Sequence, residues 1–207
     1  MQMTFAPVVI RLSVRLSYWL SVVEDITTNP LVALYFACEN DAVDGKLFRF
    51  EVQTSDIKYF DSDAVSVVSN IAKRPIDFSI EDLRELDRNE FNSEEEIQYL
   101  LHEIKYEKPH FQNVIDSKDI ERVFCVKPMF DNPRIIRQSG AFFLYGINGN
   151  KSQPASLNFS YKVYIINKAQ KRKIRKQLEA LGIDKSTLFP EVEHVAEHIK
   201  DKYHLPK

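Results

Sequence analysis

The alternation of apolar and polar residues changes character along the chain. From residue 10 to residue 18 the two kinds alternate without a break, which is the period of a half-buried strand. The stretch 31–38 instead carries no charge, and a helix that is apolar all round belongs inside a protein. Asn29 or Thr28 can cap the first turn of this helix, and Pro30 suits its first position. The sequence therefore predicts a buried helix with a polar start.

Strand and helix patterns continue to the end of the chain. We expect strands over 46–52, 122–126, the second half of 133–146, and 161–166. We expect a helix over 64–73 capped by Ser62 or Asp63, surface helices starting at Ser79 and Ser93, and helices over 168–181 and after Ser186. Because the two kinds interleave without a strict βαβ rhythm, we predict the α+β class, with a mixed or antiparallel sheet flanked by helices.

Composition narrows the class of protein. A chain of 207 residues with 44% hydrophobic content can fill one core, so we expect a single domain. Its net charge of −2 gives no overall attraction to nucleic acid or to an anionic membrane. No apolar run approaches the roughly 20 residues that span a bilayer, and Arg11 and Arg15 interrupt a signal-peptide core. We therefore expect a cytoplasmic protein with no membrane partner. Cys38 and Cys125 lack metal or redox spacing and should be buried free thiols.

Two motifs suggest chemistry that the neighbouring sequence does not support. His194-Val-Ala-Glu-His198 has the HxxEH spacing of inverted zinc peptidases. The third ligand of those enzymes has no counterpart downstream, so we expect no metal site. The basic run 168–176 has no interleaved aromatic residues for base stacking, so a solvated helix face is favoured. Nucleic acid is accordingly an unlikely partner, and binding it through this helix ranks last among the functions.

Four long motifs between residues 25 and 142 carry a resemblance to a known family. They are DITTNPLVALYFAC over 25–38, GKLFRFEV over 45–52, DIKYFDSD over 56–63 and NPRIIRQSGAF over 132–142. Together they resemble the FRG domain family of bacterial and phage proteins. The resemblance implies an FRG-like domain over 25–207 and an association with mobile elements and phage defence.

The beginning of the chain departs from that family. FRG domains carry an F/Y-R-G motif and a segment like QHYGLPTRLLD before the DxT element, and neither is present here. Residues 1–24 stand in their place as an atypical segment. The resemblance therefore predicts an N-terminally incomplete domain, which favours an inactive copy.

The order of elements is also similar to that of ADP-ribosyltransferases, which bind NAD in a split sheet. By that analogy Thr27 and Thr28 position the nicotinamide ribose, Tyr35 flanks the ring, and Gln138, on a late strand, takes the place of the acidic residue that orients the acceptor. NAD is then the cofactor, and catalysis is electrostatic positioning of an oxocarbenium-like centre.

A second hypothesis needs no chemistry. In it Asp25, Thr27, Thr28 and Asn29 face Arg134 and Gln138 across a pocket. That pocket binds a nucleotide-like small molecule or a protein partner. The two hypotheses share their residues and differ in whether the chain turns a substrate over.

Overall fold

The computed structural model describes residues 23–112 and 114–191 and has the predicted α+β architecture. Four strands form a mixed sheet in the order β1-β5-β4-β3, in which only β3 and β4 run parallel. Their bounds are Val23–Thr27 for β1, Ile57–Tyr59 for β3, Val123–Lys127 for β4 and Gly140–Tyr145 for β5. A separate antiparallel pair joins β2, Gly45–Glu51, to β8, Ser160–Ile166. The short strands β6, Ile147–Asn148, and β7, Asn150–Pro154, form a hairpin.

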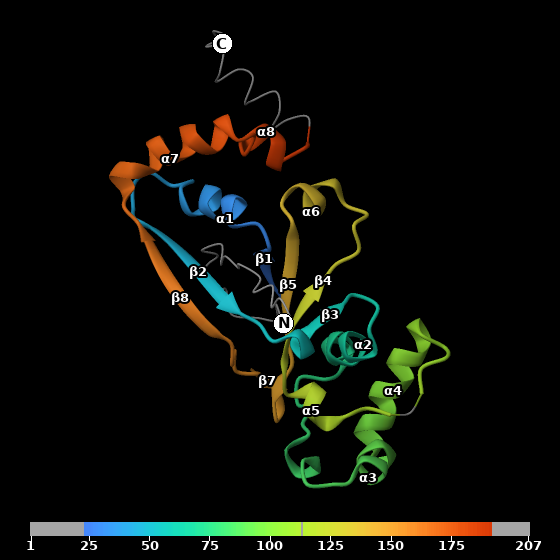
Figure 1. Ribbon diagram of the computed structural model, residues 1–207. Coiled ribbons are helices and arrows are strands. Elements are labelled where there is room, and N and C mark those ends of the chain that lie inside the picture. Colours follow the sequence, from blue (N-terminus) through green and yellow to red (C-terminus); the bar gives the residue numbers. More distant parts are fainter. Residues whose placement is uncertain (1–22, 113, 192–207) are drawn as a thin grey trace, which may run out of the picture.

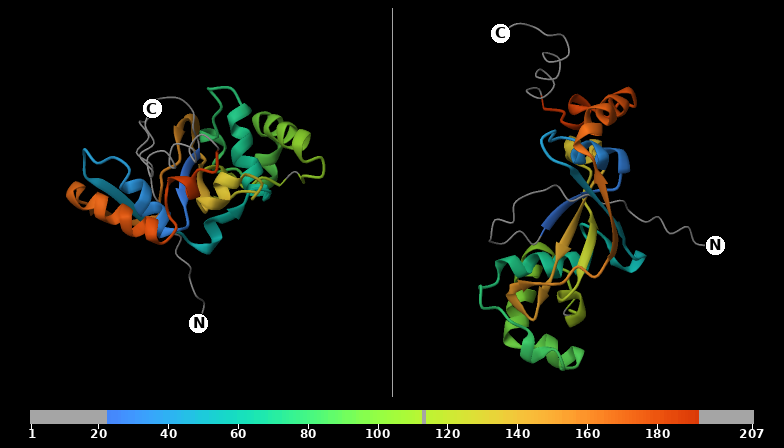
Figure 2. Two further views of the ribbon diagram at one scale, coloured as in Figure 1. Left: turned by 90° about the horizontal axis from the view of Figure 1, so that it is seen from above. Right: turned by 90° about the vertical axis from the view of Figure 1, so that its left-hand side faces the viewer.

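Helices gather at two ends of these sheets (Figure 1). One group holds α2, Asp63–Asn70, α3, Arg88–Ser93, α4, Glu95–Glu107, and α5, Ser117–Ile120, with the 3-10 turns Ile71–Lys73 and Glu81–Leu83. The other holds α1, Pro30–Ala37, α6, Pro133–Arg137, α7, Lys168–Ala180, and α8, Lys185–Leu188. Figure 2 shows the same division from two other sides, with the sheets between the groups.

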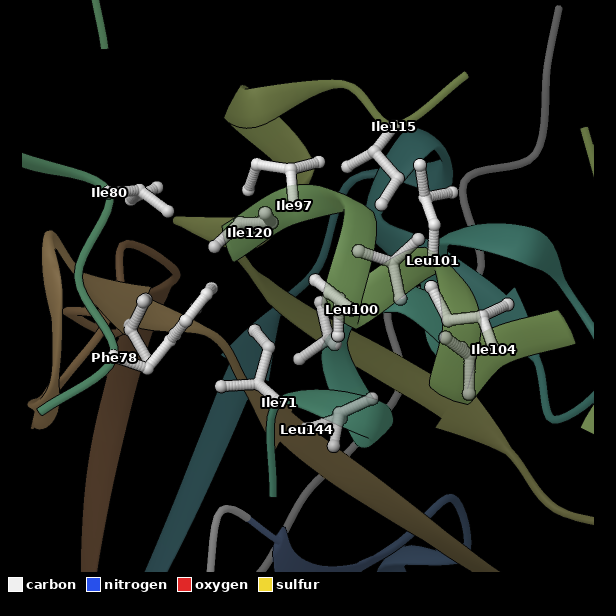
Figure 3. Packing of buried hydrophobic residues seen from close by; sticks show 14 of the residues in the cluster. Ile71, Phe78, Ile80, Ile97, Leu100, Leu101, Ile104, Ile115, Ile120 and Leu144 are labelled. Atoms are coloured by element: carbon white, nitrogen blue, oxygen red, sulfur yellow. The ribbon is translucent and has the colours of Figure 1, made fainter. Parts of the chain in front are cut away.

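The larger hydrophobic core lies between the first helix group and one face of the four-stranded sheet. The apolar stripe predicted on α4 is confirmed, because its Ile97, Leu100, Leu101 and Ile104 are almost fully buried. Figure 3 shows them packed with Ile71, Phe78, Ile80, Ile115, Ile120 and Leu144. Most of this core comes from 65–126, and Phe124, Val126 and Leu144 anchor the helices to β4 and β5.

The smaller core joins the two sheets. Phe50 of β2 meets Phe143 of β5 edge to face, with ring centroids 5.2 Å apart. Phe50 and Phe143 are buried, as are Ile26, Cys125 and Ala141 around them. Because side chains alternate along a strand, these residues mark one face of the four-stranded sheet. The second pair, β2 and β8, therefore covers part of that face.

The start of α1 is as predicted, but its burial is not. Asn29 caps the helix, since its Oδ1 accepts a hydrogen bond from the Leu31 N–H at 2.9 Å, and Pro30 follows at the first helical position. Val32 and Ala33 are completely buried, whereas Leu31 is 37% exposed. A single apolar side chain at the surface costs little, so the prediction that every side of this helix is buried is wrong.

The basic helix α7 docks on the C-terminal end of α1. Lys171 donates from Nζ to the Asn40 carbonyl oxygen at 2.7 Å and is only 1% exposed. Arg175 donates to the Cys38 carbonyl oxygen at 2.5 Å and pairs with Asp41 at 2.6 Å. The carbonyl end of a helix is partly negative, so these cations hold the two helices together. The predicted solvated face is therefore wrong for these two residues, while Gly182 ends the helix as predicted, with a φ of 76°.

Three predicted helix starts differ from the structure: only the 3-10 turn Glu81–Leu83 follows Ser79, and the predicted caps at Ser93 and Ser186 are wrong. The Ser93 hydroxyl donates back to the Glu90 carbonyl, and the capping box of this region is formed by Asp87 and Glu90 at the start of α3. Asp184, not Ser186, caps α8. Several residues in each stretch can serve as a cap, and the sequence does not say which one sits at the turn. The predicted strand 10–18 and the part of the last helix beyond 191 lie outside the described residues.

Candidate functional site

The candidate site is built where β1 ends and β5 begins. Here α6 starts with Asn132, whose Oδ1 accepts from the Arg134 N–H at 2.9 Å, followed by Pro133. This is the same Asn-Pro start as in α1. Gln138 closes α6, and Ser139 turns the chain into β5 with a φ of 49°. The prediction that a strand carries Gln138 is therefore wrong, because the Asn-Pro cap makes residues 133–137 helical.

Thr27 ties this corner together. Its hydroxyl donates to the Gln138 carbonyl oxygen at 2.6 Å and accepts from the Asn29 N–H at 3.1 Å. The Thr28 N–H donates to the Ser139 carbonyl oxygen at 2.9 Å. Thr27 is only 5% exposed. One buried hydroxyl thus fixes the end of β1, the start of α1 and the end of α6 relative to one another.

The side chains of α6 reach across to α8. Gln138 donates from Nε2 to the Leu188 carbonyl oxygen at 3.1 Å. Arg137 donates to the Thr187 carbonyl oxygen at 3.3 Å. The guanidinium of Arg134 lies 4.9 Å from the ring centroid of Phe189, within cation–π range. The residues predicted to act on a ligand therefore also hold α8 in place.

A small cavity, here called the polar pocket, opens beside this corner. It has a volume of about 230 Å³. Its described lining residues are Asp25, Ile26, Thr27, Phe36, Arg134, Ile135, Gln138, Gly140, Ala141 and Phe142. The structure thus brings together four of the residues that the sequence singled out. The exposed residues Asp25 and Arg134 provide a carboxylate and a guanidinium, of opposite charge, to its lining.

A larger cavity, here called the aromatic groove, shares Gly140 and Ala141 with the polar pocket. It has a volume of about 660 Å³. Its described lining residues are Thr28, Ile57, Tyr59, Cys125, Lys127, Phe130, Ile136, Ser139, Gly140 and Ala141. Adjacent residues are divided between the two cavities: Thr27 lines the pocket and Thr28 the groove. The predicted single cluster is therefore divided between two cavities that share Gly140 and Ala141.

Two other predicted ligand-binding residues have different surroundings. Asn29 serves as the cap of α1. Tyr35 is among the described lining residues of neither cavity. Burial and the nearby carboxylates of Glu39 and Asp184 raise the pKa of its phenol to about 12. That hydroxyl stays protonated throughout the physiological range.

Three groove residues were missed in the sequence: Tyr59, Lys127 and Phe130. Tyr59 lies within the DIKYFDSD motif, and Lys127 and Phe130 flank the Pro128 that ends a predicted strand. Side chains at strand ends often form binding sites, and this was the signal available. Cys125 lies at the base of the groove, and burial raises its pKa to about 11, so it is not a ready nucleophile.

Comparison with protein-family models, curated proteins and solved structures gives no match for this chain. The described residues contain no helix with both the length and the apolar character to cross a membrane. Within the same ranges, no three His, Cys, Asp or Glu side chains lie close enough to hold a metal ion. The functional argument therefore rests on the geometry of the two cavities.

Proposed function

We propose that this chain is an FRG-type ligand-binding module that performs no chemistry and holds a nucleotide-like small molecule beside the start of β5. The observation that supports it most is the hydrogen bond from Gln138 Nε2 to the Leu188 carbonyl oxygen. The Gln138 side chain, which was expected to act on a substrate, is instead hydrogen-bonded to another part of the protein. The link to phage defence and mobile elements rests on the FRG resemblance alone.

The chemistry of the corner agrees with a binding role. A group that stabilises an oxocarbenium-like centre must face the place where positive charge develops. The side-chain amide of Gln138 is neutral, and the backbone carbonyl oxygen of the same residue accepts a hydrogen bond from the buried Thr27 hydroxyl. These polar groups define the shape of the corner. Removing these polar groups should mainly lower the free energy of unfolding.

NAD-dependent ADP-ribosyl transfer is the second candidate, and one observation favours it. Asp25 and Arg134 line the same pocket, so a carboxylate for a cationic ribosyl centre and a guanidinium for a phosphate are both present. The pocket volume of about 230 Å³ lies below the roughly 300–1,000 Å³ usual for small-molecule sites. It could accept only part of a dinucleotide, which ranks this candidate second.

The substitutions Gln138→Ala and Asp25→Asn, together with a labelled-NAD assay, separate the two candidates. Loss of one hydrogen bond costs about 1 kcal/mol, so Gln138→Ala should lower the Tm by about 2–4 °C. Neither the wild type nor Gln138→Ala should release nicotinamide from labelled NAD. The matched control is Asp25→Asn, which alters an exposed side chain and should leave the Tm unchanged. Nicotinamide release by the wild type that Asp25→Asn abolishes would replace the binding module with the enzyme.

A further inference from the structure

We infer that the aromatic groove, rather than the polar pocket, is the ligand site, and that it takes a mononucleotide with its base against aromatic rings and its phosphate on Lys127. The inference rests on the proposed function and names the place and the ligand class. The volume of the aromatic groove, about 660 Å³, lies within the range usual for small-molecule sites. The polar pocket is about a third of that size.

Two exposed aromatic rings stand at the groove. Tyr59 at the end of β3 is 62% exposed, and Phe130 in the connection from β4 to α6 is 64% exposed. Figure 1 shows that connection leaving the end of β4 and returning above β5. Large apolar rings left in water beside a cavity mark a binding surface. Every nucleobase has a flat π-face that can stack on such rings.

Lys127 supplies the charge for a phosphate. It lies opposite Tyr59 in the parallel pairing of β3 and β4, and its ammonium is 5.4 Å from the Tyr59 ring centroid. Over the ranges that the structure describes, Lys127 forms no ion pair with a carboxylate. A lysine ammonium binds phosphate as a compact point charge. The cation therefore lies over one face of the Tyr59 ring, and a base would stack on the other face.

The rest of the groove suits an uncharged sugar and base. Ile57, Cys125 and Ala141 give it apolar walls. None of the described lining residues is acidic, so an anionic ligand is favoured over a cationic one. With one lysine in the lining, a single phosphate matches the charge better than a polyphosphate does.

Backbone strain coincides with this site. Ser139 is the only described non-glycine residue with a positive φ, 49°. Such conformations cost free energy and gather at ligand-binding positions. Within the described ranges the Ser139 hydroxyl has no hydrogen-bond partner, while its carbonyl oxygen is engaged by Thr28. The turn thus presents a hydroxyl that can bond a ribose.

Calorimetric titration with AMP, adenosine and inorganic phosphate tests the inference. AMP should bind about tenfold more tightly than adenosine. Lys127→Met should reduce AMP affinity about tenfold and leave adenosine affinity unchanged. Tyr59→Leu should weaken both about fivefold, because it removes the stacking surface. Both side chains are exposed, so the Tm should not change. Lys176→Met, at an exposed lysine on α7, is the matched control and should bind as the wild type does.

Contrary results separate this inference from the proposed function. If AMP binding is lost in Arg134→Gln but retained in Lys127→Met, the ligand occupies the polar pocket and the inference is wrong, while the binding module stands. If none of the three probes binds at millimolar concentration, the mononucleotide site is wrong. Turnover of labelled NAD refutes the binding module whatever the AMP titration shows.

Discussion

Replacing Thr27 by Val tests whether the corner is held by one hydroxyl. The substitution keeps a β-branched side chain in an extended strand and removes only the Oγ1 that bonds Gln138 and Asn29. A net hydrogen bond contributes about 1 kcal/mol, so the loss of two should lower the free energy of unfolding by about 2 kcal/mol. For a chain of this length the Tm should fall by about 4–8 °C. Urea denaturation should show a lower midpoint with an unchanged slope.

The neighbouring threonine provides the control. Thr28 is exposed, and its hydroxyl makes a longer bond of 3.2 Å to the Ser139 carbonyl oxygen. Thr28→Val should therefore change the free energy of unfolding by less than about 0.5 kcal/mol. Equal effects of the two substitutions would refute the argument, because they would show that burial of the Thr27 hydroxyl does not matter.

Two further predictions concern the first helix group. Asp87→Ala should lower the free energy of unfolding by about 1 kcal/mol, as expected for a lost N-cap, while Ser93→Ala should have almost no effect; thermal melts of the two variants decide. Hydrogen bonds from Lys73 and Asn70 lower the pKa of Glu107 from 4.5. Its stabilising contribution is therefore complete above about pH 4.5 and is lost as the pH falls through the lower folded pKa. The stability difference between wild type and Glu107→Gln should disappear on acidification, and a difference independent of pH would contradict this.

Much of the fold follows from local patterns. The apolar stripe 97–104, the strand residues 123–126 and the capped start at Asn29 and Pro30 are all readable because each depends on neighbours in sequence. The docking of α7 on α1 was not readable, because it depends on carbonyl oxygens more than a hundred residues away from Lys171. A charged residue in a helix is expected at the surface until its partner is known.

Only part of the candidate site was predicted, again because some of its residues meet through contacts that are distant in sequence. Resemblance to a family pointed to Asp25, Thr27, Arg134 and Gln138, and these do line one pocket. Tyr59 was missed, since nothing local in the sequence places it beside Lys127. The parallel pairing of β3 with β4 brings Tyr59 opposite Lys127, and long-range strand pairing leaves no periodic signal.

The two cavities divide residues that are neighbours in sequence. Thr27, the last residue of β1, lines the polar pocket, whereas Thr28, just beyond the strand, lines the aromatic groove. The same holds at α6 and its end, where Ile135 and Gln138 line the polar pocket while Ile136 and Ser139 line the aromatic groove. Residues that are adjacent in a sequence motif therefore line two different cavities.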